Sequence, residues 1–141
     1  MYEYSVIDII RIVDGDTVDV LLDLGFDIHR KERVRILGID APETRTTDEN
    51  EKKFGVEAKA YVVSWFAKHP KITVRTTKDD KYSRILGEFF DSEGLNLSHC
   101  IVEDGYAWEY DGTTKVKDYA LLLERRADPT TNASNENTQS P

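Results

Sequence analysis

The sequence predicts an α+β fold, a five-stranded OB-like antiparallel β-barrel with about three helices. Short β-branched runs fill the first forty residues, and helical periodicity appears only after them. The turns between the first three strands are a few residues long, whereas a parallel crossover requires about a dozen or more. These strands are therefore expected to form an antiparallel meander. Five strands with helices at one end match the order of a small OB-like barrel.

The five strands are expected at residues 6–13, 18–24, 33–39, 72–77 and 84–90. The first is a β-branched run that ends at the turn Asp14-Gly15-Asp16. The second alternates apolar and acidic residues, as a half-buried strand does. The third alternates too, which predicts Arg35 on the face opposite Val34 and Ile36.

Three helices follow from apolar spacing and capping residues. The first covers residues 55–68, on the spacing of Ala58, Tyr61, Val62, Trp65 and Phe66. The second is a short helix at 97–104 that ends before Gly105. The last is marked by Val116, Tyr119, Ala120 and Leu123, with Thr114 as its expected N-cap. Residues 1–126 are thus expected to form one domain, and 127–141 a polar, disordered tail.

Composition excludes several classes of protein. The chain has 141 residues, a single cysteine and no long apolar run, so neither an internal disulfide nor a membrane span is expected. The amino-terminal residues lack the basic start of a signal peptide, which predicts a cytoplasmic protein. The chain is also expected to be a monomer. The formal net charge of −8 argues against a protein that coats nucleic acid by bulk electrostatics.

Two acidic turns are the strongest chemical signal. They are Asp14-Gly15-Asp16-Thr17, between the first two strands, and Asp40-Ala41-Pro42-Glu43, after the third. In a meander both turns lie near one edge, so their carboxylates should converge. Converging carboxylates repel one another unless a cation neutralises them, and oxygen ligands suit Ca²⁺ or Mg²⁺. Each turn alone is more typical of ordinary turn chemistry than of a metal site, because Asp, Gly and Pro are common turn formers.

Two arginines favour the functional interpretation. Arg35 precedes Asp40 on the third strand, and Arg84 follows the polar turn at residues 79–83. Two guanidinium groups beside a carboxylate-bound cation would form a site for a phosphate, because each planar fork can hold two phosphate oxygens.

Three stretches together resemble one known family. They are Ile12-Val13-Asp14-Gly15-Asp16-Thr17-Val18, Arg35-Ile36-Leu37-Gly38-Ile39-Asp40-Ala41-Pro42-Glu43 and Asp80-Lys81-Tyr82-Ser83-Arg84. Their order and spacing are similar to the signature of the thermonuclease family, the staphylococcal (micrococcal) nuclease-like proteins. The resemblance covers about residues 4–126, with Gly55-Val56-Glu57-Ala58 and Gly105-Tyr106-Ala107-Trp108 as family-like flanks.

The resemblance implies a Ca²⁺-dependent phosphodiesterase that cleaves DNA and RNA with little sequence preference and leaves 3′-phosphates. Asp16, Asp40 and the backbone carbonyl of Ala41 match the calcium ligands, and Asp14 matches a carboxylate acting through water. The resemblance also assigns roles to four further residues. They are Glu43 for the attacking water, Arg35 and Arg84 for the scissile phosphate, and Tyr82 near the phosphate of a bound nucleotide.

Tyr110 is a further candidate for substrate binding. Together with Tyr106 and Trp108 it could provide an aromatic face on which a base stacks, although alternating aromatic residues more often pack a core. Two departures from the family concern stability. Ser83 stands where the family usually has glycine, and no Gly-Leu-Trp-like segment follows Asp128-Pro129.

Local charge answers the objection raised by the acidic total. Residues 30–35 sum to +3, and residues 71–84 also sum to +3. Local fields steer a charged substrate more than the net charge does, so weak, salt-sensitive binding of DNA and RNA is expected.

Two functions remain from different classes. One is a metal-dependent nuclease with Ca²⁺, or Mg²⁺ in its place, and the other is a non-catalytic OB-like module that binds nucleic acid or protein. The joint presence of the acids and both arginines favours the enzyme. The biological role is open, with salvage, degradation of a host genome by a virus and defence as alternatives.

Overall fold

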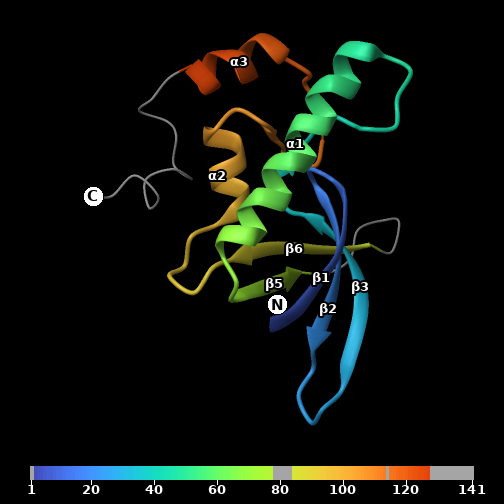
Figure 1. Cartoon of the computed structure of the whole chain (residues 1–141), viewed down its shortest axis with the longest axis vertical. Helices are drawn as coiled ribbons and strands as arrows, with labels where there is room; N and C mark the ends of the chain where they lie inside the picture. Colours follow the sequence, from blue (N-terminus) through green and yellow to red (C-terminus); the bar gives the residue numbers. More distant parts are fainter. Residues whose placement is uncertain (1, 78–83, 114, 128–141) are drawn as a thin grey trace.

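The structure is a computed structural model that describes residues 2–77, 84–113 and 115–127. Its elements in chain order are β1 (Tyr2–Asp14), β2 (Thr17–Asp23), β3 (His29–Ile36), β4 (Ile39–Asp40), α1 (Glu49–Lys68), β5 (Ile72–Thr77), β6 (Ile85–Phe90), α2 (Leu97–Glu103), β7 (Trp108–Glu109) and α3 (Tyr119–Ala127). β1, β2, β3, β6 and β5 close a barrel, in that order, and β4 pairs with β7. Figure 1 shows the helices gathered on one side, with the β2–β3 hairpin extending away from them. The predicted OB-like barrel with three helices is confirmed.

One strand pair of the barrel is parallel. The pairs β1–β2, β2–β3, β1–β5 and β5–β6 are antiparallel, as expected. β3 and β6 run parallel, with Arg35 paired to Leu86. The chain between them contains α1 and β5, which is long enough for a parallel crossover. The barrel is therefore mixed, and this one pair sets the chain that follows residue 84 beside Arg35.

β1 is bent by irregular pairing. It has 13 residues against 7 in β2, and their register shifts in three places, between Val6 and Asp8, Ile9 and Arg11, and Ile12 and Asp14. Each shift adds a residue to one strand only, which increases its local twist. As a result β1 pairs with β5 over Tyr2–Val6 and with β2 from Ser5 to Asp14.

α1 begins earlier than the sequence periodicity predicts. Its first residue is Glu49, and the carboxylate of Asp48 accepts hydrogen bonds from the amides of Asn50 and Glu51 as an N-cap. Residues 49–53 therefore belong to this helix, although its predicted start was residue 55. The predicted apolar face is correct, and it packs into the core through Ala58, Val62, Trp65 and Phe66.

The third strand begins and ends earlier than predicted. β3 ends at Ile36, Gly38 takes a φ of +87°, and Ile39 begins β4, where it pairs with Glu109. The expected alternation also fails at the end of β3, because Val34, Arg35 and Ile36 are all buried. The core covers one face of the strand there, and the first acidic turn covers the other.

The last helix differs from its prediction as well. α3 begins at Tyr119, where the Asp118 carboxylate accepts a hydrogen bond from the amide of Leu121, and Val116 lies before it with 66% of its surface exposed. Leu122 is the buried residue of α3, whereas the predicted Leu123 is exposed. The expected N-cap Thr114, the tail at 128–141, and Tyr82 and Ser83 lie outside the described residues.

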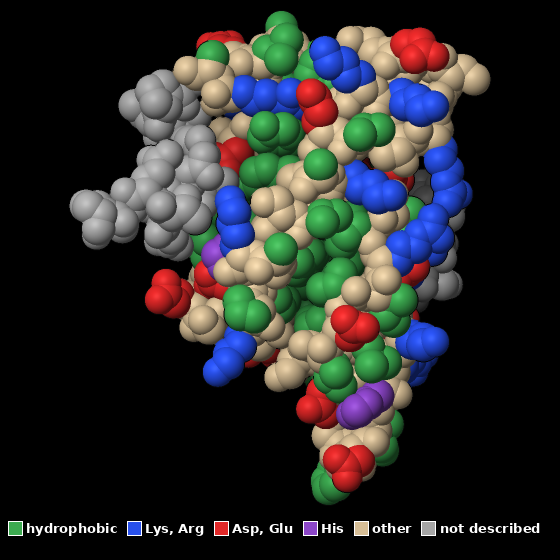
Figure 2. All heavy atoms as spheres, in the orientation of Figure 1, with side chains coloured by type: hydrophobic (Ala, Val, Ile, Leu, Met, Phe, Trp, Pro, Cys, Tyr) green, Lys and Arg blue, Asp and Glu red, His purple; other side chains and the backbone are tan. Residues whose placement is uncertain are grey.

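An apolar hollow lies between β1 and the carboxyl-terminal half of α1. Figure 2 shows apolar side chains gathered there. Ile7, Ile10, Val63 and Phe66 are among its lining residues, and its volume is 460 Å³. None of the lining residues belongs to the two acidic turns.

Among the residues that the structure describes, no helix has the length and apolar character needed to cross a membrane.

α1 touches both acidic turns through residues that have little or no side chain. A Cβ added at Gly15 would lie 2.8 Å from the Cβ of Ala58 and 2.9 Å from that of Ala41. A Cβ added at Gly55 would lie 2.3 Å from the carbonyl oxygen of Glu43. Contacts this short do not occur between real atoms, so the turns and the helix can approach only because these positions carry no larger side chain.

We therefore expect Gly55→Ala to lower the free energy of unfolding by about 2 kcal/mol, because the added methyl group overpacks a rigid backbone contact. Urea denaturation measures this change. The neighbouring substitution Val56→Ala is the control, because Val56 is 53% exposed on the same helix; its change should stay within about 0.5 kcal/mol. Equal stability of the two variants would contradict the proposed contact.

Candidate active site

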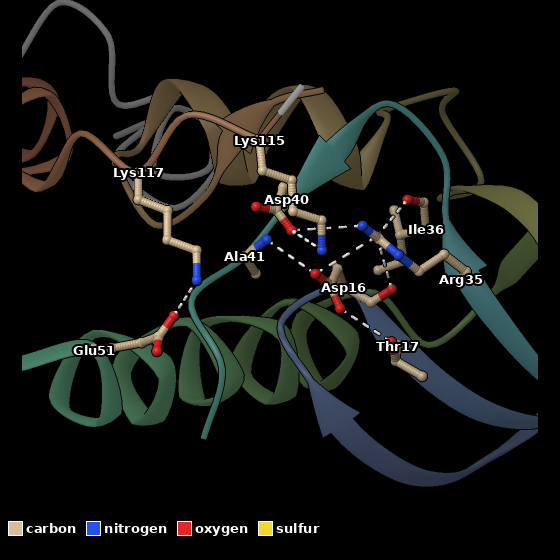
Figure 3. Close-up of polar contacts among 9 residues, drawn as sticks. All are labelled: Asp16, Thr17, Arg35, Ile36, Asp40, Ala41, Glu51, Lys115 and Lys117. Atoms are coloured by element: carbon tan, nitrogen blue, oxygen red, sulfur yellow. Dashed lines mark hydrogen bonds and ion pairs between the residues drawn. The ribbon is translucent and has the colours of Figure 1, made fainter. Parts of the chain in front are cut away.

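The two acidic turns meet at Arg35. Asp16 follows the end of β1, and Asp40 closes β4. The guanidinium group of Arg35 lies between them, with Nη1 3.5 Å from Oδ2 of Asp16 and Nη2 3.7 Å from Oδ1 of Asp40. Figure 3 shows all three side chains pointing into one space beside the amino end of the second turn. The predicted convergence of Asp16, Asp40 and Arg35 is what the structure contains.

Asp16 is held rigidly by the chain around it. Its Oδ2 accepts a hydrogen bond of 2.9 Å from the amide of Ala41, and its Oδ1 accepts one of 3.0 Å from the hydroxyl of Thr17. Its backbone carbonyl accepts a hydrogen bond of 2.7 Å from the amide of Ile36. The first acidic turn is therefore tied to the second turn and to β3 at once.

Asp40 is buried and incompletely satisfied. It is 4% exposed, and β4 holds it opposite the buried Trp108 of β7. Its Oδ2 is buried and has no hydrogen-bond partner among the residues that the structure describes. Burial raises the pKa of the Asp40 carboxyl above its ordinary value, and the nearby charge of Asp16 adds to the rise, while Lys115 and Arg35 oppose it. A buried carboxylate oxygen without a donor is costly unless a ligand takes it.

Lys115 is a second cation at the same carboxylate. Its Nζ lies 3.5 Å from Oδ1 of Asp40, and half of its side-chain surface is exposed. Two residues further on, Lys117 Nζ lies 2.6 Å from Oε2 of Glu51 on α1, away from the Asp16–Asp40 pair. The segment before α3 thus places one lysine on each of two acidic residues.

Arg35 is fixed more firmly than Lys115. It is 7% exposed, and its Nη1 donates a hydrogen bond of 3.1 Å to the carbonyl of Ile36 and a longer one of 3.5 Å to that of Asp16. Its distances to the two carboxylates exceed the 2.7–2.9 Å or so of a strong charge-assisted hydrogen bond. Arg35 is therefore positioned beside both acids without being tightly bound to either.

Asp14 and Glu43 belong to the same two acidic turns as this pair. The Oδ1 of Asp14 accepts hydrogen bonds from the hydroxyl and the amide of Thr44, at 2.7 and 3.2 Å. This contact ties the segment after Glu43 to the end of β1. Glu43 itself is exposed, and the backbone contact with Gly55 holds its main chain against α1.

The remaining residues that were predicted to bind the substrate are Arg84, Tyr110 and Tyr82. Arg84 precedes β6, the parallel neighbour of β3, so the two predicted arginines come from adjacent strands. Tyr110 follows β7, and its amide donates a hydrogen bond to the carbonyl of Gly38. Its ring centroid is 5.9 Å from Nζ of Lys115. Tyr82 lies outside the described residues.

The donor set fits a divalent cation only if the backbone contributes. Within residues 2–77, 84–113 and 115–127, no group of three or more His, Cys, Asp or Glu side chains is close enough to hold a metal ion. Asp16 and Asp40 form a pair of carboxylates, and a further donor would have to come from the backbone, for which the carbonyl of Ala41, directly after Asp40, is the candidate. The unpartnered Oδ2 of Asp40 gives this pair a free buried oxygen, and oxygen donors of this kind suit Ca²⁺ and Mg²⁺.

Comparison with known proteins identifies the family. A model described as "Staphylococcal nuclease homologue" matches residues 33–131. The chain belongs to this family. The match includes Arg35, Asp40, Glu43 and Arg84, and it begins after the first acidic turn.

Relatives of this nuclease-homologue chain carry endonuclease names. Endonuclease YhcR of Bacillus subtilis (strain 168) is 35% identical over 107 residues, which are 71% of this chain and 8% of the relative. An uncharacterized endonuclease of Escherichia coli is 31% identical over 103 residues, 73% of this chain and 60% of the relative. The micrococcal nuclease of Shigella flexneri is 29% identical over 111 residues, 73% of this chain and 57% of the relative. The chain thus spans under two thirds of each, and the family supports a nuclease.

Two site residues of this family member could not be found by sequence reasoning. Lys115 lies 75 positions after Asp40 in the printed sequence, in a polar stretch that has no motif. Thr44 stands at the start of a charged stretch that lies outside the three family-like stretches. Both contacts depend on chain segments that come together only in the folded barrel.

The raised pKa of Asp40 predicts how pH affects the metal-free protein. An acid with a raised pKa binds more protons folded than unfolded, so its ionisation lowers stability as pH rises. We expect Asp40→Asn to gain melting temperature relative to the wild type as pH increases from about 4 toward neutrality.

Thermal melting in EDTA across this range measures the difference. With a divalent cation added at neutral pH, the wild type should be stabilised and Asp40→Asn should not, because the variant lacks the carboxylate. A difference in EDTA that stays constant with pH would contradict the assigned environment of Asp40.

Proposed function

We propose that the chain is a Ca²⁺-dependent nuclease that hydrolyses phosphodiester bonds of DNA and RNA with little sequence specificity and leaves 3′-phosphate ends. The observation that carries the proposal is the buried, unpartnered Oδ2 of Asp40 beside Asp16 and Arg35. A binding module would gain nothing from two buried carboxylates, those of Asp16 and Asp40, that repel one another. A cation-dependent phosphodiesterase requires such a pair. Family membership and the endonuclease names of the relatives support the same reaction class.

The acids of both turns are proposed to hold the cation. Asp16, Asp40 and the backbone carbonyl of Ala41 would be its direct protein ligands, and Asp14 would act through the water around it. When bound, a divalent cation supplies positive charge to the phosphoryl oxygens on which negative charge develops. The hydrogen bond from the Ala41 amide keeps the Asp16 carboxylate oriented before the cation arrives, so little rearrangement is needed.

Glu43 is proposed to accept a proton from the attacking water or to orient that water. The water oxygen forms a bond to phosphorus, the bond from phosphorus to the 5′ oxygen breaks, and the phosphate stays on the 3′ side. A general base in this position contributes a factor of about 10² to 10⁴ in rate. The exposed side chain and the clamped backbone of Glu43 are consistent with this role, because the side chain can reach substrate from a fixed main chain.

Arg35 and Arg84 are proposed to hold the scissile phosphate from two adjacent strands. Each guanidinium group remains charged at any physiological pH and presents a planar fork to phosphate oxygens. Stabilisation of the developing charge by one such donor is worth about 3 kcal/mol in a site that excludes water. Arg35 is available for this task because its contacts with the two carboxylates are long.

Tyr82 and Tyr110 are proposed to contact the substrate beside the reacting phosphate. Tyr110 is tied to the site by its amide and lies near Lys115 on the rim. Binding to DNA and RNA should be weak, because the protein carries a net charge of −8. It should also be salt-sensitive, because the attraction comes from the basic segments 30–35 and 71–84. The active species is proposed to be a monomer.

The alternative is a non-catalytic OB-like module that binds nucleic acid or protein. It is favoured only by the overall acidic charge and by the general use of this barrel type for binding. A module without catalytic activity would have no need to keep Arg35, Asp16 and Asp40 together around a buried oxygen that lacks a hydrogen-bond partner.

Cleavage of single-stranded DNA and RNA by the full chain tests the proposal. We expect cleavage with added Ca²⁺, none in EDTA, and products that end in 3′-phosphates by end-group analysis. Mg²⁺ is tested in parallel, because an all-oxygen site also suits that ion. Folded protein that cleaves neither substrate with either ion would favour the binding module.

Glu43→Gln provides the matched catalytic variant. It removes the proton acceptor and keeps the size of the side chain, so the rate should fall by at least about 10² while folding and metal binding persist. Circular dichroism and calcium titration check the last two points. A folded Glu43→Gln protein with near-normal activity would exclude the proposed role.

A further inference from the structure

Four charged groups balance one another at the candidate site. Asp16 and Asp40 supply two negative charges, and Arg35 and Lys115 supply two positive charges within 3.7 Å. A divalent cation bound to Asp40 would lie close to both of these positive groups in a partly buried space. Like charges in such a space repel strongly, so one of the two cationic side chains has to move when a metal ion binds.

Lys115 is the group that can move. Arg35 is 7% exposed and donates to the carbonyls of Ile36 and Asp16, so its displacement would break two buried hydrogen bonds. Lys115 has half of its side-chain surface in solvent. An ammonium group on a flexible stem can return to water at little cost.

We propose that the ammonium group of Lys115 takes the place of the metal ion in the metal-free protein. It pairs with the Asp40 carboxylate and competes directly with the divalent cation, and this role is called the stand-in. The inference rests on the proposed function only in placing a cation at Asp40. Lys115 is a positioning residue in this account, because it acts on the reaction through the occupancy of Asp40 and not on the reacting atoms.

The surroundings of Lys115 provide a position for the displaced ammonium group. Its Nζ already lies 5.9 Å from the ring centroid of Tyr110, on the rim of the site. The chain on either side is anchored: the Tyr110 amide donates to Gly38, and the indole of Trp108 donates to the carbonyl of Asp118 at 3.0 Å. The ammonium group can therefore leave Asp40 while its segment stays beside the site.

The stand-in explains how two acids remain together without metal. Lys115 and Arg35 lie 3.5 and 3.7 Å from the same oxygen, Oδ1 of Asp40, and leave Oδ2 without a partner. In the metal-free state the positive charges of Lys115 and Arg35 thus neutralise Oδ1, whereas Oδ2 is open to a metal ion. Such an arrangement keeps the site assembled and lowers its affinity for metal.

Calorimetric titration of EDTA-treated full-length protein with CaCl₂, in the absence of substrate, tests the inference. Lys115→Gln removes the competing charge, and its affinity for Ca²⁺ should rise about tenfold over the wild type. Lys117→Gln is the matched control. It removes the same charge from the same segment, but its partner is Glu51, so its affinity for Ca²⁺ should stay close to that of the wild type. Circular dichroism of each variant checks that it is folded.

Each outcome decides one point. Tighter calcium binding by Lys115→Gln alone supports the stand-in, including the case in which only this variant binds measurably. Equal or weaker binding by folded Lys115→Gln, with calcium-dependent cleavage by the wild type intact, overturns the inference and leaves the proposed nuclease standing. Equal gains in Lys115→Gln and Lys117→Gln would overturn it too, because they would reflect general charge. Absence of calcium binding in every variant would overturn both the stand-in and the calcium dependence.

Discussion

The close approach of α1 to the two acidic turns is the constraint on which the site depends. Gly15 meets Ala58 and Ala41, and Gly55 meets the backbone of Glu43, at distances that leave no room for a larger side chain. This packing lets the end of β1 and the segment after β4 lie against one helix. The Asp16 carboxylate can then accept a hydrogen bond from the Ala41 amide, and the Asp40 side chain is buried beside it. The chemistry of the site thus follows from contacts between small residues.

Charge balance is the second feature that shapes the molecule. The protein is acidic overall, and its candidate site concentrates two carboxylates in a place where burial already raises the pKa of Asp40. Arg35 and Lys115 make that arrangement tolerable, and they differ in how firmly they are held. In the proposed nuclease the fixed arginine would serve both the folded site and a substrate phosphate, whereas the exposed lysine would be exchanged for a metal ion. The same contacts would therefore stabilise the metal-free state and leave the site ready to bind a metal ion.

Sequence reasoning predicted the barrel and the meeting of Asp16, Asp40 and Arg35, because turn chemistry and short connections limit how a meander can fold. It placed Val116 in the last helix and continued the third strand to Ile39, since periodicity cannot detect a turn at Gly38 or an N-cap at Asp118. The contacts of Lys115 and Thr44 were beyond its reach. They join residues far apart in the chain, and only tertiary packing determines such pairs.

A crystal structure of the wild-type chain grown with Ca²⁺ tests the central claim most directly. The account predicts a calcium ion in contact with Asp40 Oδ2, Asp16 and the Ala41 carbonyl, at the usual distances of about 2.3–2.6 Å. It also predicts that Lys115 Nζ has left Asp40 while Arg35 keeps its contact with the Ile36 carbonyl. Calcium bound elsewhere, or absent from Asp40 with the Lys115 ion pair intact, would contradict the account.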